Sequence, residues 1–223
     1  LWAVLALKNE GFVPKKRIRL IAGLDEESGS GCMKHYVKNE EMPTLSFTPD
    51  ADFPVIFIEK GILRVKLTAE NTEPVCITGG ERANMVPPNA KAVFNKEEKI
   101  YLGKSAHAAS PQKGENAIIK AIKDNVSLIN PKGIYSFINT YFSNDVNGKA
   151  AGLYVSDIES GEITFNLGLS SCGEENTIIF DIRYPVSTDV DKLIKRFGDI
   201  AKPYGVLVEV LAQVKPLYVK KDS

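Results

Sequence analysis

The stretch NTIIFDIRY (176–184) is rich in Ile and Phe, residues that favour β-structure, and it predicts a strand. One charged residue, Arg183, interrupts its apolar pattern. The preceding stretch GEITFNLGL (161–169) predicts a second strand, and Gly173 lies in the turn between them. These two strands form the centre of the expected fold.

Two amphipathic helices and two further strands flank this pair. Apolar residues recur at helical spacing over 113–129 and again over 188–202. KIYLGKSA (99–106) and GVLVEVLAQV (205–214) read as the outer strands. The order β-α-β-β-α-β predicts a ferredoxin-like α+β unit.

The N-terminal part has a different pattern. Helices are predicted over 1–11 and about 32–41, and the nearly continuous apolar run RIRLIAGL (17–24) predicts a buried parallel strand. TLSFTPDADFPVIFIEKG (44–61) holds two short β-like pieces around its prolines. This alternation predicts an α/β layer. We therefore expect two domains: 1–59 with the return 214–223, and 60–213, which opens with the alternating strand GILRVKLTA (61–69).

Composition excludes several classes of protein. The 223 residues are 43% hydrophobic, and Lys+Arg equals Asp+Glu at 28 each, which gives no electrostatic case for nucleic acid or a membrane surface. No apolar run approaches the roughly 20 residues that span a bilayer. The three scattered cysteines argue against a disulfide framework and favour a reducing, cytoplasmic location.

Two acidic loops follow predicted strands. In LDEESGSG (24–31) three acids are adjacent, so one of Glu26 and Glu27 could bind a metal while the other moves a proton. The alternative is that this turn caps the next helix. In TPDADFP (48–54), Asp50 and Asp52 could complete a cation site, or could form an ordinary Asx turn.

Three more residues could contact a ligand. His107 lies among small residues in GKSAHAASP (103–111), Asn84 precedes a Pro-Pro pair, and the Arg183 guanidinium could bind a carboxylate in a bidentate way. The structural alternatives are a satisfied loop histidine and an edge-strand arginine that faces solvent. His35, beside two lysines, reads as a surface residue.

In order, LDEESGSG, TPDADFPVIFIEKG, NMVPPNAKA, GKSAHAASPQKGENA and DIRYP resemble the motifs of the dinuclear zinc aminoacylase/carnosinase metallopeptidases, and most of all the bacterial peptidase-V-type dipeptidases. The resemblance covers nearly the whole chain. It implies that Glu26 is the general base, and that Glu27 and Asp50 each bind one of two zinc ions. It also implies that His107 stabilises the oxyanion, and that Asn84 and Arg183 hold the substrate.

The resemblance further implies a small dipeptide substrate, a lid domain over 60–213 inserted into a catalytic domain, and a monomer or a lid-mediated dimer. The family's remaining zinc ligands are not found, so the chain reads as a middle segment that is inactive alone. The connection through Phe94–Tyr101 is also shorter than the family's. Two alternatives stay open: an N-acyl amino acid or succinyl-diaminopimelate-type deacylase of the same fold, and a non-catalytic binding or dimerisation module.

Overall fold

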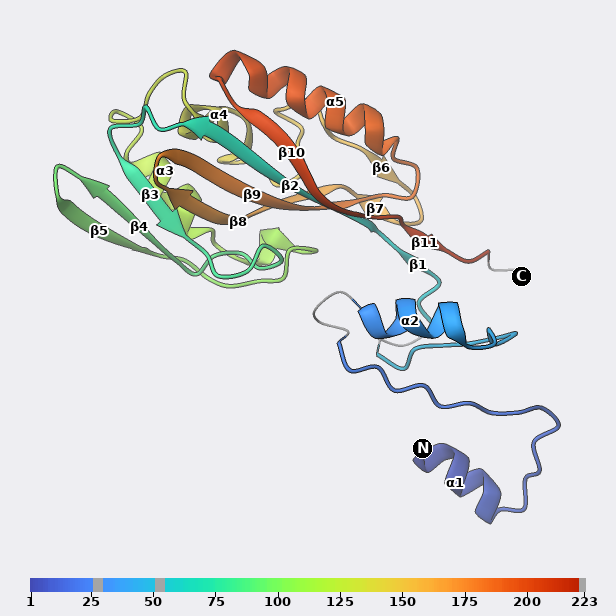
Figure 1. Cartoon of the computed structure of the whole chain (residues 1–223). Helices are drawn as coiled ribbons and strands as arrows, with labels where there is room; N and C mark the ends of the chain where they lie inside the picture. The colour runs from blue at the N-terminus through green and yellow to red at the C-terminus, as the bar shows by residue number, and fades with distance from the viewer. Residues whose placement is uncertain (26–29, 51–54, 221–223) are drawn as a thin grey trace. The chain divides into compact units, whose positions relative to one another are not determined.

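The computed structural model describes residues 1–25, 30–50 and 55–220. The chain divides into two compact units, Leu1–Ala51 and Asp52–Ser223, and each is described by itself. Figure 1 shows the helices and strands of both units in chain order.

The N-terminal unit contains helices α1 (Trp2–Asn9) and α2 (Gly31–Asn39), close to the two predicted helices. The strand expected at 17–24 is wrong, because none of these residues belongs to a strand or has a ladder partner in the described part of the chain. Leu20 is 70% exposed and Leu24 is 97% exposed. An apolar run forms a buried strand only when neighbouring strands satisfy its backbone groups, and the described part of this unit contains no strand.

The second unit is built mainly of strands. Its elements are β1 (Ile58–Glu59), β2 (Gly61–Glu70), β3 (Cys76–Gly79), β4 (Asn89–Phe94), β5 (Glu97–Leu102), η2 (Pro111–Lys113), α3 (Ala117–Asp124), α4 (Ile134–Phe142), β6 (Ser156–Asp157), β7 (Gly161–Glu162), β8 (Thr164–Cys172), β9 (Glu175–Tyr184), α5 (Val190–Ala201), η3 (Lys202–Tyr204), β10 (Leu207–Val214) and β11 (Leu217–Tyr218).

Seven of these strands form one antiparallel sheet in the order β10-β2-β9-β8-β3-β4-β5. Strands β2, β8, β9 and β10 with their helices form the predicted β-α-β-β-α-β unit, so the α/β fold class is confirmed. The sequence predicted residues 99–106 as the first strand of this unit, and that prediction was wrong. The first strand is β2. The region 99–106 instead contributes β5, the last strand of an insertion that extends the sheet beyond β8.

One face of the sheet carries the hydrophobic core. Alternation along β2 buries Leu63, Val65 and Leu67 completely, while Arg64 lies on the opposite face. Helices α3, α4 and α5 cover the apolar face, and their aromatic residues pack with those of β8 and β9. In that cluster Phe142 of α4 contacts the rings of Phe165, Phe180 and Phe197.

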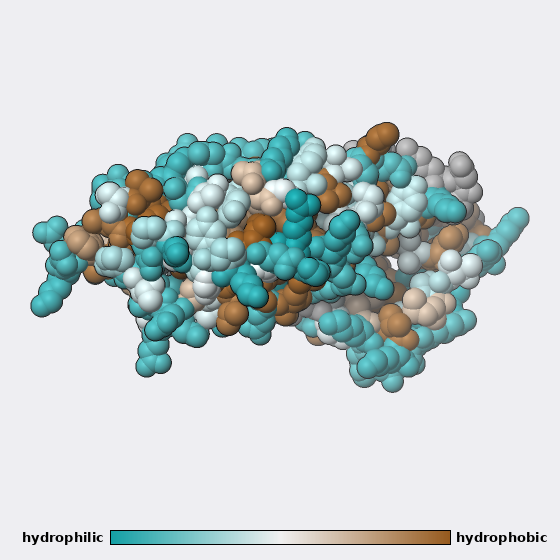
Figure 2. Space-filling model, turned by 90° about the horizontal axis from the view of Figure 1, so that it is seen from above, coloured by the Kyte–Doolittle hydropathy of each residue, from teal (hydrophilic) through white to brown (hydrophobic). Residues whose placement is uncertain are grey.

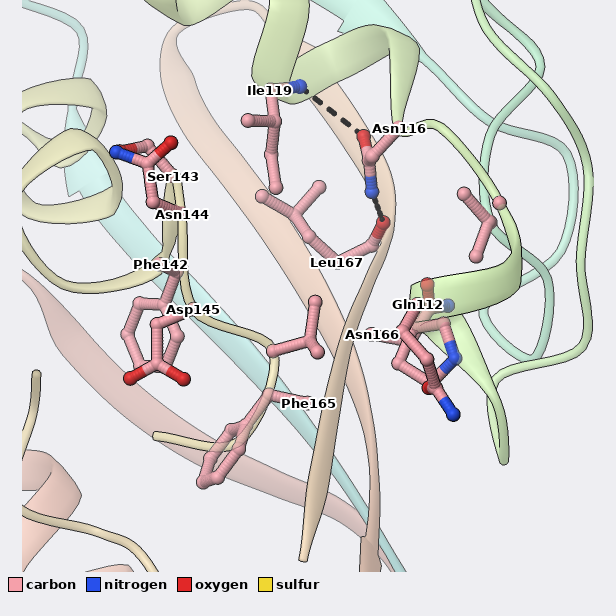
Figure 3. A pocket seen from close by; sticks show the side chains of 14 residues that line it. Gln112, Asn116, Ile119, Phe142, Ser143, Asn144, Asp145, Phe165, Asn166 and Leu167 are labelled. Atoms are coloured by element: carbon pink, nitrogen blue, oxygen red, sulfur yellow. Dashed lines mark hydrogen bonds between the residues drawn. The ribbon is translucent and has the colours of Figure 1, made fainter. Parts of the chain in front are cut away.

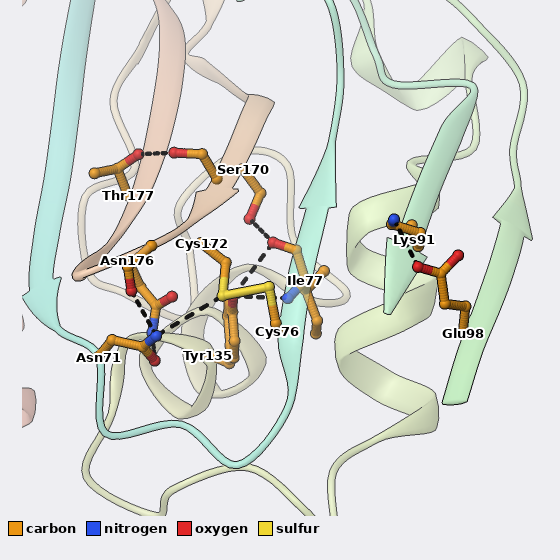
Figure 4. The surroundings of a disulfide bond; sticks show 12 residues. Asn71, Cys76, Ile77, Lys91, Glu98, Tyr135, Ser170, Cys172, Asn176 and Thr177 are labelled. Carbon is orange, nitrogen blue, oxygen red and sulfur yellow. Dashed lines mark hydrogen bonds and ion pairs between the residues drawn. A yellow bond between two sulfur atoms is a disulfide. The ribbon is translucent and has the colours of Figure 1, made fainter. Parts of the chain in front are cut away.

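The junction of β3 with β8 is narrow. Its ladder contains one register pair, Gly79↔Ser170, and a disulfide joins Cys76 to Cys172 beside it, with 5.6 Å between the Cα atoms. Figure 4 shows this bond together with the Ser170 hydroxyl, which donates a 2.7 Å hydrogen bond to the Ile77 carbonyl. The three cysteines had argued against a disulfide framework, and the structure corrects this in part: one bond forms, between cysteines 96 residues apart in the chain.

Two local features bear on the predicted domain limits and the short connection. Strand β1 pairs antiparallel with β11, so the chain enters and leaves this unit side by side. This pairing is the arrangement that an inserted domain requires, and the division at 59/60 and 213/214 stays a prediction. The short connection forms a tight hairpin, in which Asn95 and Lys96 adopt positive φ and Phe94 pairs with Glu97.

The surface shown in Figure 2 mixes apolar and polar residues. Within the described ranges, no helix is both long enough and apolar enough to cross a membrane.

Candidate functional site

The first acidic motif is described only in part. Glu26 and Glu27 lie outside the described residues, so their predicted roles stay predictions. The Asp25 carboxylate accepts hydrogen bonds from the backbone N–H groups of Gly31 (2.6 Å) and Cys32 (2.9 Å), at the start of α2. A hydrogen bond from the Cys32 side chain, followed by these two backbone bonds, lowers the pKa of Asp25. The capping interpretation is thus confirmed for Asp25.

In the second acidic motif, the structure describes one of the two residues that could bind a metal ion. Asp50 is exposed, and Asp52 lies outside the described residues. Among the residues that the structure describes, no group of three or more His, Cys, Asp or Glu could hold a metal ion. Because Glu27 is not among them, the predicted two-zinc site is untested.

The predicted lid residues Asn84 and His107 lie side by side. Met85 and His107 form an isolated antiparallel bridge, and the Ala108 N–H donates a 2.9 Å hydrogen bond to the Asn84 carbonyl. Asn84 belongs to the segment between β3 and β4, and His107 to the segment after β5. The two segments are therefore paired through their backbones, although Met85 and His107 lie 22 positions apart in the sequence.

Local hydrogen bonding defines the chemistry of His107. Its Nδ1 accepts a 3.2 Å hydrogen bond from the Ala109 N–H, which places the ring proton of the neutral imidazole on Nε2. The ring is exposed, so Nε2–H can donate to a ligand. A neutral donor of this kind suits a carbonyl oxygen that gains negative charge in a transition state.

Arg183 lies on β9, directly opposite Thr164 of β8. The Thr164 hydroxyl donates a 3.3 Å hydrogen bond to the Ala108 carbonyl, next to His107. Because directly opposed residues project from the same face of a sheet, Arg183 lies on the face that carries the Asn84 and His107 segments. The structure thus brings together the three predicted residues of this unit. The alternative of an arginine facing solvent is wrong, because only 15% of its side chain is exposed.

Two residues of β8, Asn166 and Gly168, hold the Asn84 segment in place, and sequence reasoning missed both. Asn166 is 1% exposed, and its Nδ2 donates to the carbonyls of Ala83 (2.8 Å) and Met85 (2.9 Å), on either side of Asn84. At Gly168 a Cβ would meet the Ala83 carbonyl oxygen at 2.3 Å, so glycine is needed for the close approach. The signal was present as polar residues alternating with apolar ones along 164–168.

A pocket of about 160 Å³ adjoins this site. Figure 3 shows Asn166 and Gln112 on one side of it and Phe142, Asn144 and Asp145 on the other. Asn116 accepts hydrogen bonds at the start of α3 and donates a 2.7 Å bond to the Leu167 carbonyl. Asn166 lines this pocket and also holds the Asn84 segment through its hydrogen bonds. None of the described lining residues is Asn84, His107 or Arg183.

His35, interpreted as a surface residue, is exposed in the N-terminal unit. It contributes to the lining of a second pocket, of about 250 Å³, together with Cys32 and Tyr36 of the same helix. The nearby extended segment supplies Ile21 and Gly23.

The chain is similar along its whole length to proteins of Staphylococcus aureus that carry the name "Putative dipeptidase". The protein of strain USA300 is 34% identical over 266 aligned positions, and those of strains MW2 and bovine RF122 are 33% identical. The chain covers 57% of each, so it spans little more than half the length of these curated relatives. A scan against protein-family models gives no match.

Proposed function

We propose that this chain is part of a zinc-dependent dipeptidase. The observation that carries the proposal is the convergence of Asn84, His107 and Arg183 on one face of the sheet, supported by the names of the similar staphylococcal proteins. These residues provide an amide, a neutral imidazole N–H and a guanidinium, which match the carbonyl and terminal carboxylate of a dipeptide.

In this proposal the residues divide the work of hydrolysis. The Arg183 guanidinium binds the substrate carboxylate, and Asn84 binds its backbone. The Nε2–H of His107 donates to the carbonyl oxygen as that oxygen gains charge. Glu26 takes the proton of the attacking water and passes it to the leaving amine. Glu27 and Asp50 would each hold one zinc ion, and bound zinc would polarise the carbonyl and lower the pKa of water.

We further propose that the chain alone is inactive, because Glu27 and Asp50 are too few ligands for a stable pair of zinc ions. Zinc titration of the 223-residue chain should then show no tight binding of two ions. Two tightly bound zinc ions with dipeptidase activity would contradict this part of the proposal.

The function is tested by substituting His107 in the complete enzyme. His107→Ala removes a donor that acts mainly in the transition state, so we expect kcat to fall by about 10²–10³ with little change in KM. His35→Ala is the matched control, since it removes the other histidine of the chain and should leave both constants unchanged. Equal activity of the two variants would overturn the assignment of His107.

A panel of dipeptides and N-acyl amino acids separates the proposal from the deacylase alternative. The printed names of the relatives favour dipeptides. Faster deacylation would favour the alternative, and no hydrolysis by the complete protein would favour the binding module. The monomer or lid-mediated dimer stays a prediction. The cytoplasmic location also stays a prediction. The cysteines no longer support it, because Cys76 and Cys172 form a disulfide.

A further inference from the structure

Asp181 is the most buried charged residue near the candidate site, and the predicted motifs gave it no role. It lies on β9 with 0% exposure, opposite Asn166 on β8 and Arg64 on β2. A carboxylate this deeply buried requires partners that replace its lost hydration. The partners of Asp181 are two guanidinium groups.

The two arginines bind Asp181 through different nitrogens. The Arg183 Nε donates a 2.6 Å hydrogen bond to Oδ1, and an Arg64 Nη donates a 3.2 Å bond to Oδ2. Within the described residues, no hydrogen bond from either Nη of Arg183 is present. The end of the Arg183 guanidinium with its two Nη groups is thus available for a second carboxylate in a bidentate geometry.

The surroundings of Arg183 favour an anion. Asp181 fixes the orientation of the Arg183 guanidinium through Nε and, among the described residues, leaves both of its Nη groups free to donate. The side chain of Arg64 is 38% exposed and that of Arg183 is 15% exposed, so Arg183 is the more shielded cation. A shielded, pre-oriented guanidinium binds a carboxylate with less loss of side-chain entropy than a mobile one.

We propose that Asp181 is the positioning residue of the candidate carboxylate-binding subsite: it holds Arg183 by Nε so that its Nη groups meet the terminal carboxylate of the substrate. This role rests on the proposed dipeptidase function. It extends that function by naming the residue that sets the preference for a free carboxylate. Asp181 acts through Arg183 and does not touch the substrate.

The main test compares a free-acid dipeptide with its C-terminal amide, both assayed on the complete enzyme. The measured quantity is kcat/KM for the free acid divided by kcat/KM for the amide. Asp181→Asn should lower this ratio at least tenfold, mainly because KM for the acid rises. Arg64→Gln is the matched control, because it removes the other partner of Asp181 and should change the ratio less than twofold. In an Arg183→Met background, Asp181→Asn should have no further effect on the ratio.

Other outcomes would overturn the proposal. If Asp181→Asn lowers activity on both substrates equally, Asp181 has only a structural role. If Arg64→Gln lowers the ratio as much, Arg64 and not Asp181 sets the preference.

A second measurement tests the proposal even if the Asp181→Asn variant does not fold. In NMR spectra of the wild-type chain, the Arg183 Nε–H signal, assigned by Arg183→Lys, should exchange slowly compared with that of Arg17, whose side chain is 67% exposed. Fast exchange would overturn the positioning role. If the wild-type enzyme cleaves neither substrate, the proposed function fails, and the NMR measurement alone decides whether Asp181 holds Arg183.

Discussion

The seven-stranded sheet has a four-strand part (β10, β2, β9, β8) and a three-strand part (β3, β4, β5) that differ in how they are held. In the four-strand part, β2 and β9 pair along their full length, from Gly61↔Tyr184 to Glu70↔Glu175. The three-strand part meets its neighbour through the single pair Gly79↔Ser170. Long ladders join the strands of the first part, whereas side chains and a disulfide supplement the single ladder pair that joins the second part to the first.

This difference matters for the candidate site because each part supplies some of its residues. Arg183 belongs to the four-strand part, while Asn84 and His107 lie on segments that flank β4 and β5. Their relative positions depend on the β3–β8 junction and on the bonds from Asn166 to the Asn84 segment. A site that spans such a junction can lose its geometry before the fold is lost.

The largest effect is expected in the core of the four-strand part. Phe142 is 2% exposed, and its ring centroid lies 5.0 Å from that of Phe180 and 5.4 Å from that of Phe165. Phe142→Ala should lower the free energy of unfolding by about 3–5 kcal/mol, because it leaves a cavity. Chemical denaturation measures the loss. Ile100→Ala on β5, which is 61% exposed, is the control and should change stability by less than about 0.5 kcal/mol.

The next effect is expected at the junction. Cys76→Ser removes a disulfide that closes a loop of 96 residues, and it should cost about 2–4 kcal/mol. Cys32→Ser is the matched control, because Cys32 is a free cysteine of the described chain, and it should have little effect. Equal stability of the two variants under oxidising conditions would show that the disulfide does not hold the junction.

A smaller effect is expected from Tyr135, whose hydroxyl accepts from the Ile77 N–H and donates to the Ile77 carbonyl on β3. Tyr135→Phe leaves both backbone groups without this partner and should cost about 1–2 kcal/mol. Tyr154→Phe, at a partly exposed tyrosine, should cost less.

Tyr135 also predicts a dependence on pH. Burial raises its pKa from 10.0 to about 12, so the folded state favours the neutral phenol. Its contribution to stability is complete below pH 10 and is lost as the pH rises toward 12. The stability difference between wild type and Tyr135→Phe should therefore shrink over this range. A constant difference would contradict the raised pKa.

The smallest effect is expected at Asn116, which caps α3 and also donates to Leu167 across the junction. Asn116→Ala should cost about 1 kcal/mol, measured by thermal or chemical unfolding. Asn116→Asp keeps the cap acceptor and loses the donor to Leu167, so it should cost less. If Asn116→Asp costs as much as alanine, the bond across the junction and not the cap is the larger contribution.

Much of the four-strand part could be predicted from local patterns. The alternation at 61–69 and 176–184, and the amphipathic pattern at 188–202, correspond to β2, β9 and α5. Strand β3, by contrast, has only four residues and was not predicted, and β5 was placed in the wrong role. Short strands carry too few residues for a period to be read, and their pairing partners lie far away in the chain.

The candidate site shows the same division. Asn84, His107 and Arg183 were recognised as residue types that could bind a ligand, and the structure brings them together. Asp181 and Asn166 were missed because alternation indicates that polar residues share one face of a strand but does not show whether that face is buried. The strand expected at 17–24 was wrong for a related reason: an apolar run does not specify whether a neighbouring strand is there to pair with it.

By itself the sequence determined the periodicity of the long strands and helices, and the chemical types available for a site. Periodicity is a local property, since side-chain direction follows from backbone geometry. Only the tertiary structure decided that Cys76 meets Cys172, that Asp181 lies between two arginines, and that the Asn84 segment pairs with the His107 segment through Met85. These contacts depend on strand register between distant segments, and register is set by how the whole core packs.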